Sequence, residues 1–289
     1  MTKRIILTGT GPRGFVGRNL EETLKEKYEL FIPNSQELDL CNYEAVTRYT
    51  DKYKIDSIVH ACSSFNNILD SDLRMYFNLE KISRNLEKMI YFGSGAEFDK
   101  RFDIIMASED DIGNRIPVDD YGFAKYIMTN HARLSRNIYC LRLFGIFGKY
   151  EDWTCKFISN ICCKAAYNLP LTIRRECKFD YIYIEDLPKV VEWFLENKPV
   201  YHDYNFTYGT PVLLTELAKM TLKSAAKNLD VLILNPDGFN NEYTSCNKRI
   251  LNELSWFRPT KLDIAVEKLY KYYVDNINII DKAKLKNTK

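Results

Sequence analysis

Residues 4–17 of the chain read RIILTGTGPRGFVG, an apolar run followed directly by a glycine-rich turn and by the start of an amphipathic segment. This pattern predicts a strand over 4–9 and a helix over 15–28. Glycines at such a turn let backbone N–H groups approach a pyrophosphate, which the positive end of the following helix stabilises. The stretch therefore predicts a phosphate-binding turn at the start of an α/β fold.

The glycines of this turn fit two registers. Gly9, Gly11 and Gly14 spell GxGxxG, whereas Gly11, Gly14 and Gly17 spell GxxGxxG. Glycine clusters by themselves more often mark plain turns. Here the cluster lies between the first strand and the first helix of the chain, which favours dinucleotide binding.

The rest of the first half alternates short apolar runs with helical patterns. The runs predict strands over 29–32, 56–62, 89–94 and 138–143, separated by helices over 43–53, 73–86 and 120–135. Such an alternation is typical of a Rossmann-type doubly wound parallel sheet, whose ligand lies beyond the carboxyl ends of the strands. We therefore expect residues 1–150 to form an NAD(P)-binding domain.

After residue 148 the alternation changes. The pattern predicts a helix over 154–167, strands over 171–174 and 179–184, a helix over 186–195 and a strand over 204–207, with a mostly helical and irregular remainder from Pro211. Segments near 179–207 are expected to return to the sheet, and residues 151–289 to form mainly a smaller substrate-binding lobe. No Pro/Gly/Ser-rich linker separates the halves, so we expect a small-molecule cleft between them.

Composition excludes several classes of partner. The 289 residues carry 41 Lys and Arg against 39 Asp and Glu, so the net charge of +2 gives no reason to expect nucleic acid or an anionic membrane. No apolar run approaches the ~20 residues of a membrane span, and the apolar run near the start is too short for a secretory signal. The eight cysteines are scattered and only three histidines are present, so we expect no metal and a reducing cytoplasmic location.

The end of the second strand bears on the choice of cofactor. NAD-binding proteins usually place an acid there to hold the ribose 2′-hydroxyl, but this strand runs into Pro33, Asn34 and Ser35. Arg13 in the glycine turn could pair with a 2′-phosphate. Both features favour NADP, with NAD as the alternative if Arg13 is merely solvated and Glu37 or Asp39 replaces the acid.

A tyrosine and a lysine lie four residues apart in the predicted helix 120–135. Tyr121 and Lys125 share a helix face, and a nearby cation stabilises a phenolate, which makes a tyrosine usable as an acid or base. The hydroxyl of Ser94, at the end of the 89–94 strand, is expected to point into the same cleft mouth.

With these residues in place, the chain resembles the extended short-chain dehydrogenase/reductase family, also described as the NAD-dependent epimerase/dehydratase family of nucleotide-sugar enzymes. The resemblance rests on the glycine turn, Leu38-Asp39-Leu40, His60-Ala61-Cys62-Ser63-Ser64, Asn78, Ser94, Tyr121, Lys125, Leu141-Arg142-Leu143-Phe144-Gly145 and the stretch from Asp180 to Leu187. Among its members the chain is most similar to the GDP-fucose synthases.

The resemblance implies a set of site residues. Ser94, Tyr121 and Lys125 would be catalytic, with Tyr121 moving a proton and Lys125 also holding the nicotinamide ribose. The cofactor would be bound by Gly11, Arg13, Gly14, Phe15, Val16, Gly17, Asp39, Leu40, Ala61, Cys62, Ser63, Tyr121 and Lys125. The substrate would be bound by Gly95, Ala96 and Arg249, although Arg249 could equally belong to a surface basic pair.

Departures from the family pattern narrow the chemistry. Dehydratases carry Asp and Glu at the positions of Gly95 and Ala96, and Glu97 is expected to face away. The GDP-fucose synthases use a Cys at the position of Ala96 and a His in the second lobe, but no His occurs between His131 and His202. Hydride transfer alone remains, which predicts a 4-keto-sugar reductase.

One further departure and two alternatives complete the expectations. An Arg that often meets substrate phosphates is replaced by Phe179, for which Lys178, Arg174 or Arg175 could compensate. The alternatives to a reductase are a nucleotide-sugar 4-epimerase with tightly bound NAD and a non-catalytic NADP-binding sensor or scaffold. Relatives often form homodimers through two helices, for which the apolar candidates here are Met75, Phe77, Tyr126, Ile127 and Met128.

Overall fold

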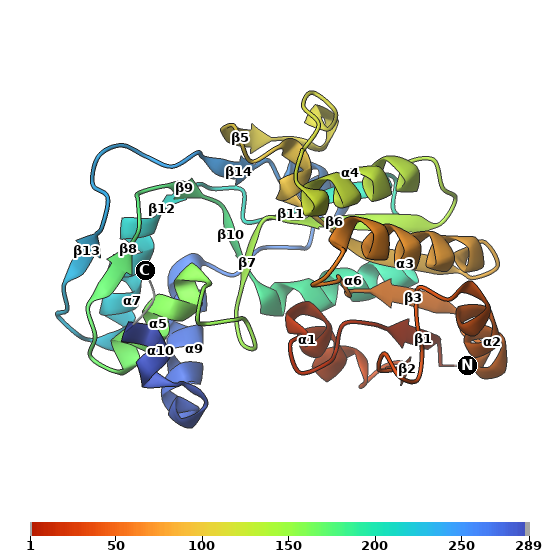
Figure 1. Ribbon diagram of the computed structural model, residues 1–289, viewed down its shortest axis with the longest axis horizontal. Helices are drawn as coiled ribbons and strands as arrows, with labels where there is room; N and C mark the ends of the chain where they lie inside the picture. Colours follow the sequence, from red (N-terminus) through yellow and green to blue (C-terminus); the bar gives the residue numbers. More distant parts are fainter. Residues whose placement is uncertain (1, 287–289) are drawn as a thin grey trace.

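The computed structural model describes residues 2–286 and is built around a six-stranded parallel sheet (Figure 1). Its strand order is β2-β1-β3-β4-β6-β11, with the bounds β1 Arg4–Leu7, β2 Glu29–Phe31, β3 Ser57–His60, β4 Lys88–Ser94, β6 Ile138–Leu143 and β11 Asp203–Phe206. From β1 the sheet grows to β2 on one side and to β3 on the other. The order reverses at this point, where doubly wound sheets bind their ligands.

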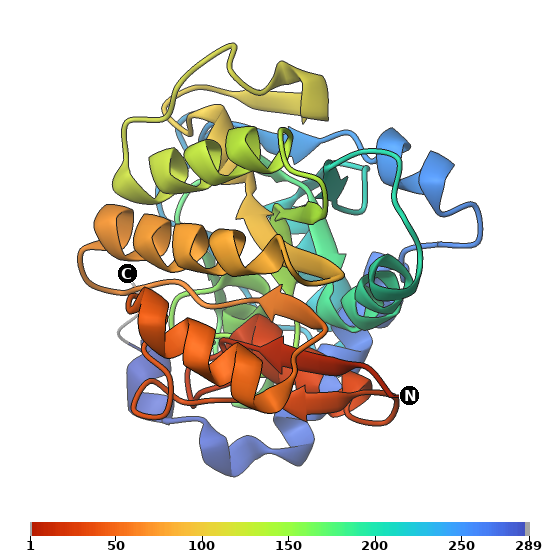
Figure 2. The same ribbon diagram turned by 90° about the vertical axis from the view of Figure 1, so that its right-hand side faces the viewer.

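Helices cover both faces of the sheet. Figure 2 shows α2 (Tyr43–Tyr53), α3 (Ile68–Ser83) and α4 (Asp120–Ala132) in a row on one face. The other face carries α1 (Phe15–Leu24) and α6 (Leu187–Glu196), which contact each other.

Strand periodicity explains why both faces are covered. Ile5 and Leu7 belong to the hydrophobic cluster on the α1 and α6 face, whereas Ile6 belongs to the cluster under α2, α3 and α4. In β4 the same alternation places Ile90 on the first face and Tyr91 on the second. Because successive strand side chains point to opposite faces, an uninterrupted apolar strand requires a layer of helices on each side.

The second lobe is made of helices and three small sheets. Its helices are α5 (Phe157–Ala166), α7 (Leu214–Ala225), α9 (Leu262–Asp275) and α10 (Lys282–Lys286), whereas α8 (Lys248–Glu253) packs on β11 at the edge of the parallel sheet. The small sheets pair β7 (Gly145–Phe147) with β10 (Tyr181–Tyr183), β8 (Leu171–Ile173) with β13 (Val231–Ile233), and, in the order β12-β9-β14-β5, Val212–Leu213, Lys178–Phe179, Tyr243–Ser245 and Ile104–Ala107. Single turns of 3-10 helix occur at Gly95–Phe98, Glu109–Asp111, Ile184–Asp186 and Ile277–Ile279.

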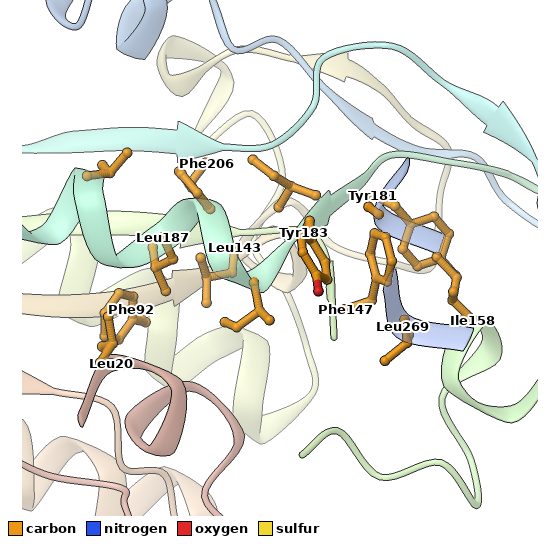
Figure 3. Packing of buried hydrophobic residues seen from close by; sticks show 14 of the residues in the cluster. Leu20, Phe92, Leu143, Phe147, Ile158, Tyr181, Tyr183, Leu187, Phe206 and Leu269 are labelled. Carbon is orange, nitrogen blue, oxygen red and sulfur yellow. The ribbon is translucent and has the colours of Figure 1, made fainter. Parts of the chain in front are cut away.

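One hydrophobic core joins the sheet to the second lobe. Figure 3 shows Leu20, Phe92 and Leu143 on the sheet side, followed by Tyr183 and Leu269 towards α9. These side chains belong to a single buried cluster. Because burying apolar surface is favourable, the shared core holds the two lobes together.

The structure confirms the predicted fold class and corrects several elements. The predicted strand over 179–184 is two strands, because the chain passes at Asp180 from β9 in one small sheet to β10 in another. The buried Asp180 carboxylate accepts the N–H of Gly209 at 3.0 Å and anchors this crossing. The region after Pro211, expected to be mostly helical and irregular, also contributes three strands, and β5 was not predicted.

Smaller differences concern element ends. The predicted helix over 73–86 begins five residues earlier, at Ile68, and the predicted strand over 4–9 ends at Leu7, before the turn at Gly9. Between residues 2 and 286, none of the helices is long and apolar enough to cross a membrane.

Candidate active site

A cleft of about 820 Å³ opens at the carboxyl ends of the sheet strands, between the sheet and the second lobe. On the sheet side it is lined by Phe15, Val16, His60, Ala61, Cys62, Ser63, Ser94, Ala96, Tyr121 and Lys125. On the other side it is lined by residues that include Glu151, Lys156, Arg175, Cys177, Phe179 and Tyr243. The structure thus brings most of the predicted site residues to one cavity.

The glycine turn after β1 is shaped by close backbone packing. A Cβ on Gly14 or Gly17 would lie 1.9 or 2.3 Å from the carbonyl oxygen of Gly9, so neither position accepts a larger residue. Gly11 is exposed with open space around it. The structure describes every residue of the first turn of α1, and none of them is acidic. No side chain caps the N–H groups at this end of the helix, so its positive end is available to an anion such as a pyrophosphate.

Arg13 extends from this turn and stacks on an aromatic ring. Its guanidinium carbon lies 4.2 Å from the centroid of Phe65, in the loop after β3. Both side chains are exposed, Phe65 by 66%. Within residues 2–286 no carboxylate pairs with this guanidinium, so it remains able to meet a phosphate.

Glu37 and Asp39 are the two acids that could replace the missing carboxylate at the end of the second strand, and each already holds a backbone N–H group of its own loop. The Glu37 carboxylate accepts the backbone N–H of Asn34 at 2.9 Å and thereby caps its own turn. Asp39 is exposed and accepts the N–H of Cys41 at 2.9 Å. The carbonyl of buried Leu40 accepts a hydrogen bond from Asn78 at 3.0 Å, which fixes this segment on α3.

Two further titratable groups of the cleft floor carry no charge at neutral pH. His60 is buried at the end of β3 and its ring contacts the Thr8 hydroxyl at 3.0 Å. Burial, and then the charge of Lys125, lowers the pKa of His60 to about 3. Burial also raises the pKa of the Cys62 thiol. Neither group is poised for proton transfer near neutral pH.

Tyr121 and Lys125 lie on one face of α4, as predicted. The Lys125 ammonium lies 5.8 Å from the centroid of the Tyr121 ring and is 4% exposed. Its counter-charge is Asp72 of α3, whose Oδ2 is 4.0 Å away. Asp72 also accepts the Ser63 hydroxyl at 2.6 Å and the Ser64 N–H at 2.7 Å. Sequence reasoning missed Asp72, because no local pattern relates it to Lys125.

Ser94 ends β4 and caps the 3-10 helix that follows. Its hydroxyl oxygen accepts the N–H of Ala96 at 3.2 Å, and its own N–H is held by Glu97 at 2.8 Å. Glu97 turns into the interior, where it pairs with the buried Arg142 at 2.9 Å. The expectation that Glu97 faces away from the cleft agrees with its position, which is set by the 3-10 turn that follows β4.

Glu151 is a buried acid on the wall of the cleft. Its carboxyl group accepts a hydrogen bond from the Ser159 hydroxyl at 2.5 Å. Burial raises its pKa to about 8, so the carboxyl holds its proton at neutral pH. Sequence reasoning did not single it out.

Basic side chains lie at the second-lobe end of the cleft. Lys156 and Arg175 line it, and Arg175 also lines an adjoining pocket of about 320 Å³ with Arg174, Asn235 and Asn240. Lys100 lines the cleft as well, but it lies 3.9 Å from Asp119, the residue that caps α4. Arg174 and Arg175 are two of the residues predicted to compensate for the replacement by Phe179. The third, Lys178, instead lies 4.0 Å from Glu242.

Arg249 does not occupy the predicted position at the substrate phosphates. It lines a different surface pocket, with Asp110 and Glu253. Its guanidinium lies 2.5 Å from Asp110, 3.2 Å from Asp203 and 3.6 Å from Glu109. These carboxylates, of which Asp203 also pairs with Arg133 and Arg142, hold Arg249 outside the lining of the cleft. Within residues 2–286, no three His, Cys, Asp or Glu side chains are grouped as metal ligands.

Comparison with known proteins agrees with this architecture. Residues 8–206 match the model of the NAD dependent epimerase/dehydratase family. A GDP-L-colitose synthase from Yersinia pseudotuberculosis is 21% identical, over 95% of this chain and 99% of the relative. A GDP-L-fucose synthase from Sinorhizobium fredii is 22% identical, over 92% of this chain and 95% of the relative.

Solved structures show the same fold. A GDP-L-fucose synthetase from Naegleria fowleri bound to NADP superposes with a TM-score of 0.81 at 15% identity, covering 96% of this chain and 97% of that one. A GDP-mannoheptose C4 reductase from Campylobacter jejuni with NADP bound gives a TM-score of 0.77 at 18% identity, covering 94% and 98%. Since the family model spans more than half of the residues, the chain belongs to the NAD dependent epimerase/dehydratase family.

Proposed function

We propose that this protein is an NADPH-dependent reductase that converts the keto group of a 4-keto nucleotide sugar into a hydroxyl. The observation that carries the proposal is the convergence of Ser94, Tyr121 and Lys125 on one cleft. The positions after the serine are Gly95 and Ala96, neither of which can carry a proton. Such a site can reduce a carbonyl but has no acid–base pair at these positions for eliminating water.

The residues around the glycine turn fit a dinucleotide. The open backbone at Gly11 and the uncapped end of α1 would hold the pyrophosphate, and Arg13 would hold a 2′-phosphate, which favours NADP over NAD. When bound, the reduced cofactor supplies a hydride. Lys125 would hold the nicotinamide ribose, since its ammonium lies in the cleft beside Tyr121.

In the proposed reaction the chain itself handles one proton. The Tyr121 phenol donates its proton to the ketone oxygen as negative charge develops there. The Ser94 hydroxyl donates a hydrogen bond to the same oxygen and keeps it in place. The Lys125 ammonium stabilises the phenolate that Tyr121 leaves behind, because opposite charges attract strongly in a site shielded from water.

The far end of the cleft suits the nucleotide part of the substrate. Lys156 and Arg175 place positive charge where a diphosphate would lie, in the absence of the family arginine at Phe179. Both curated relatives and both solved structures described above carry GDP-linked names, so GDP sugars are the first substrates to test.

Stopped-flow oxidation of NADPH with GDP-linked and other nucleotide-linked 4-keto sugars tests the proposal. We expect stoichiometric NADPH consumption with at least one of them, and none with the 4-hydroxy sugars. A protein that copurifies with NAD and interconverts 4-hydroxy epimers without net NADPH consumption would instead be a 4-epimerase. A protein that binds NADP but turns over no sugar would be a sensor or scaffold.

The location of the protein belongs to the same proposal. All eight cysteines are free thiols, which supports a reducing compartment such as the cytoplasm.

The oligomeric state is also part of the proposal. Phe77 and Ile127 leave apolar surface partly exposed on the adjoining helices α3 and α4, which supports a homodimer. Met75 and Met128, which were also candidates for this surface, are buried in the core of the chain itself.

A further inference from the structure

Glu151 is an acid of the cleft wall that the proposed mechanism does not use. It follows the turn at Gly148, between β7 and α5, and is only 8% exposed. Its Oε2 accepts the hydroxyl of Ser159, a fully buried residue in the first turn of α5, at 2.5 Å. This bond fixes the carboxyl group on the second-lobe side of the cleft.

The other carboxyl oxygen of Glu151 opens to the cleft. Within residues 2–286, Oε1 has no hydrogen-bond partner, and it is not among the unpaired side-chain atoms that are closed off from solvent. Because Glu151 lines the cleft, the accessible surface of this oxygen belongs to the cleft. Polar groups of buried residues normally have a partner, so an oxygen left open at a binding cleft is available to a ligand.

No cation neutralises this carboxyl group. In the described part of the chain Glu151 forms no ion pair, and the charges that act on it, Lys156 and Asp152, are opposite in sign, exposed and on the same loop. Burying a carboxylate without a counter-ion is costly, and burial accordingly raises the pKa of Glu151 to about 8. The group is therefore a neutral carboxylic acid at neutral pH.

The other titratable groups that interact with Glu151 keep their protons at neutral pH. Cys162 of α5, Tyr181 of β10 and Tyr273 of α9 lie around it, and burial raises the pKa of each. Burial also raises the pKa of Cys155, on the same loop as Glu151. Among these groups, Glu151 is the one expected to change its charge between about pH 7 and pH 9.

The hydrogen bond from Ser159 decides where the acid proton lies. A protonated carboxyl group has one O–H donor, and because Oε2 accepts the serine hydroxyl, that donor is Oε1. It faces the cleft and carries no charge. Such a donor binds a hydroxyl oxygen without repelling the phosphates expected at Lys156 and Arg175, whereas a carboxylate in its place would repel them.

We propose that Glu151 is a substrate-binding residue whose Oε1 forms a hydrogen bond with an oxygen atom of the sugar. This inference rests on the proposed reductase function, in which the keto carbon lies at Ser94 and Tyr121 and the diphosphate lies at Lys156 and Arg175. The sugar joins these two ends, and Glu151 belongs to the lining of the same cleft, on the side of the second lobe.

Calorimetric titration of the NADP-saturated protein tests the contact, with GDP-mannose as one ligand and GDP as the ligand that lacks a sugar. Glu151→Gln keeps the shape and an N–H donor, whereas Glu151→Met removes the hydrogen bond. We expect the Kd of GDP-mannose to rise roughly tenfold in Glu151→Met and to stay within about twofold of wild type in Glu151→Gln, with the Kd of GDP unchanged in both. An unchanged Kd of GDP-mannose in Glu151→Met, or an equal loss for GDP, would overturn the inference.

The pH dependence of binding separates this contact from a merely structural role. Wild-type protein loses the Glu151 proton above about pH 8, so its Kd for GDP-mannose should rise there, by at most about tenfold per pH unit. Glu151→Gln does not titrate and should keep the same Kd at about pH 7 and pH 9. Asp152→Asn, which changes the adjacent exposed acid, is the matched control and should follow wild type. A wild-type Kd that is as constant as that of Glu151→Gln would refute the contact.

Carboxyl labelling provides a test that needs no sugar. A water-soluble carbodiimide with glycine ethyl ester should label Glu151 and the exposed Asp152, but not the enclosed Glu97, which is paired with Arg142. Peptide mass spectrometry identifies the labelled residues. An unlabelled Glu151 beside a labelled Asp152 would overturn the cleft-facing carboxyl. If Glu151 is labelled but wild-type protein neither binds GDP-mannose nor reduces a keto sugar, the open carboxyl is real and it is the reductase assignment that fails.

Discussion

Lys125 Nζ lies 4.0 Å from Asp72 Oδ2, and both side chains are almost fully removed from solvent. The carboxylate also holds the Ser63 hydroxyl and the Ser64 N–H, at 2.6 and 2.7 Å. One buried acid therefore connects the proposed catalytic lysine on α4 with the loop that follows β3. Removing one partner of a buried charge pair leaves the other charge uncompensated, which is costly.

Asp72→Asn should weaken NADPH binding and lower kcat, because it releases both Lys125 and the loop after β3. A loss of one charge-assisted contact of ~1.5–3 kcal/mol corresponds to a roughly 10- to 150-fold increase in the Kd of NADPH. Fluorescence titration measures this change. Asp70→Asn is the control, since Asp70 lies on the same helix but pairs with the exposed Arg74. Equal affinities of Asp72→Asn and wild type would show that the ion pair does not organise the site.

Tyr121→Phe should reduce kcat by about 10²–10⁴-fold with little change in NADPH affinity, because it removes only the proton donor. Ser94→Ala should behave similarly. Lys125→Met should impair both turnover and cofactor binding. Stopped-flow NADPH oxidation and equilibrium titration separate these effects, with Tyr126→Phe on the same helix as control. Wild-type turnover in Tyr121→Phe would exclude the mechanism.

Arg13→Ala should remove most of the preference for NADP over NAD. The Arg13 guanidinium stacks on Phe65 and would meet the 2′-phosphate that only NADP carries. A contact of ~1.5–3 kcal/mol predicts a roughly 10- to 150-fold loss of NADP affinity and almost none of NAD affinity. Arg136→Ala, an exposed arginine in the loop between α4 and β6, serves as control. Titrations in which wild type binds both cofactors equally would contradict the assignment.

Glu151→Gln should change how stability depends on pH. Burial raises the pKa of Glu151 to about 8 from an ordinary value of 4.5, so between these values the folded protein keeps a proton that the unfolded chain releases. The stabilising contribution of this retained proton to the free energy of unfolding is therefore complete below pH 4.5. This contribution declines as pH rises through the window, by at most about 1.4 kcal/mol per pH unit.

The glutamine variant lacks this titration, so its free energy of unfolding should rise relative to wild type between about pH 5.5 and pH 8. Urea denaturation at both pH values measures the difference. Glu26→Gln, at an exposed position, should instead track wild type. Parallel behaviour of Glu151→Gln and wild type would mean that Glu151 is ionised in the folded protein.

The proposed homodimer predicts a mass of twice 33.9 kDa by light scattering at tens of micromolar protein. Ile127→Glu should produce a monomer, because it places a charge on the partly exposed apolar surface of α4. Val200→Glu, at a position 73% exposed, should leave the mass unchanged. A wild-type monomer under these conditions would reject the dimer.

Much of the fold follows from local patterns. The glycine turn between a strand and a helix, and the alternation of apolar runs with amphipathic segments, predict the parallel sheet. The structure confirms that sheet, and helix 43–53 and strand 138–143 have the predicted bounds. Such patterns are readable because helix and strand each repeat along the chain with a fixed period. The spacing of Tyr121 and Lys125 on one helix face is local in the same sense.

The environment of that site depends on contacts between residues distant in sequence. Tyr243 contacts Gly95 from β14, a strand that the sequence pattern did not predict. Asp72 of α3 pairs with Lys125 of the neighbouring helix α4. Arg249, which resembled a phosphate ligand in sequence, is neutralised by carboxylates that include Asp203. The role of a side chain depends on the charges and hydroxyl groups that surround it. These neighbours are brought together by packing between helices and strands. The repeating pattern of apolar residues along the chain does not predict such packing. The sequence by itself therefore determined the sheet and which residues, Ser94, Tyr121 and Lys125, are proposed as the catalytic set, whereas tertiary packing decided which other groups surround that set.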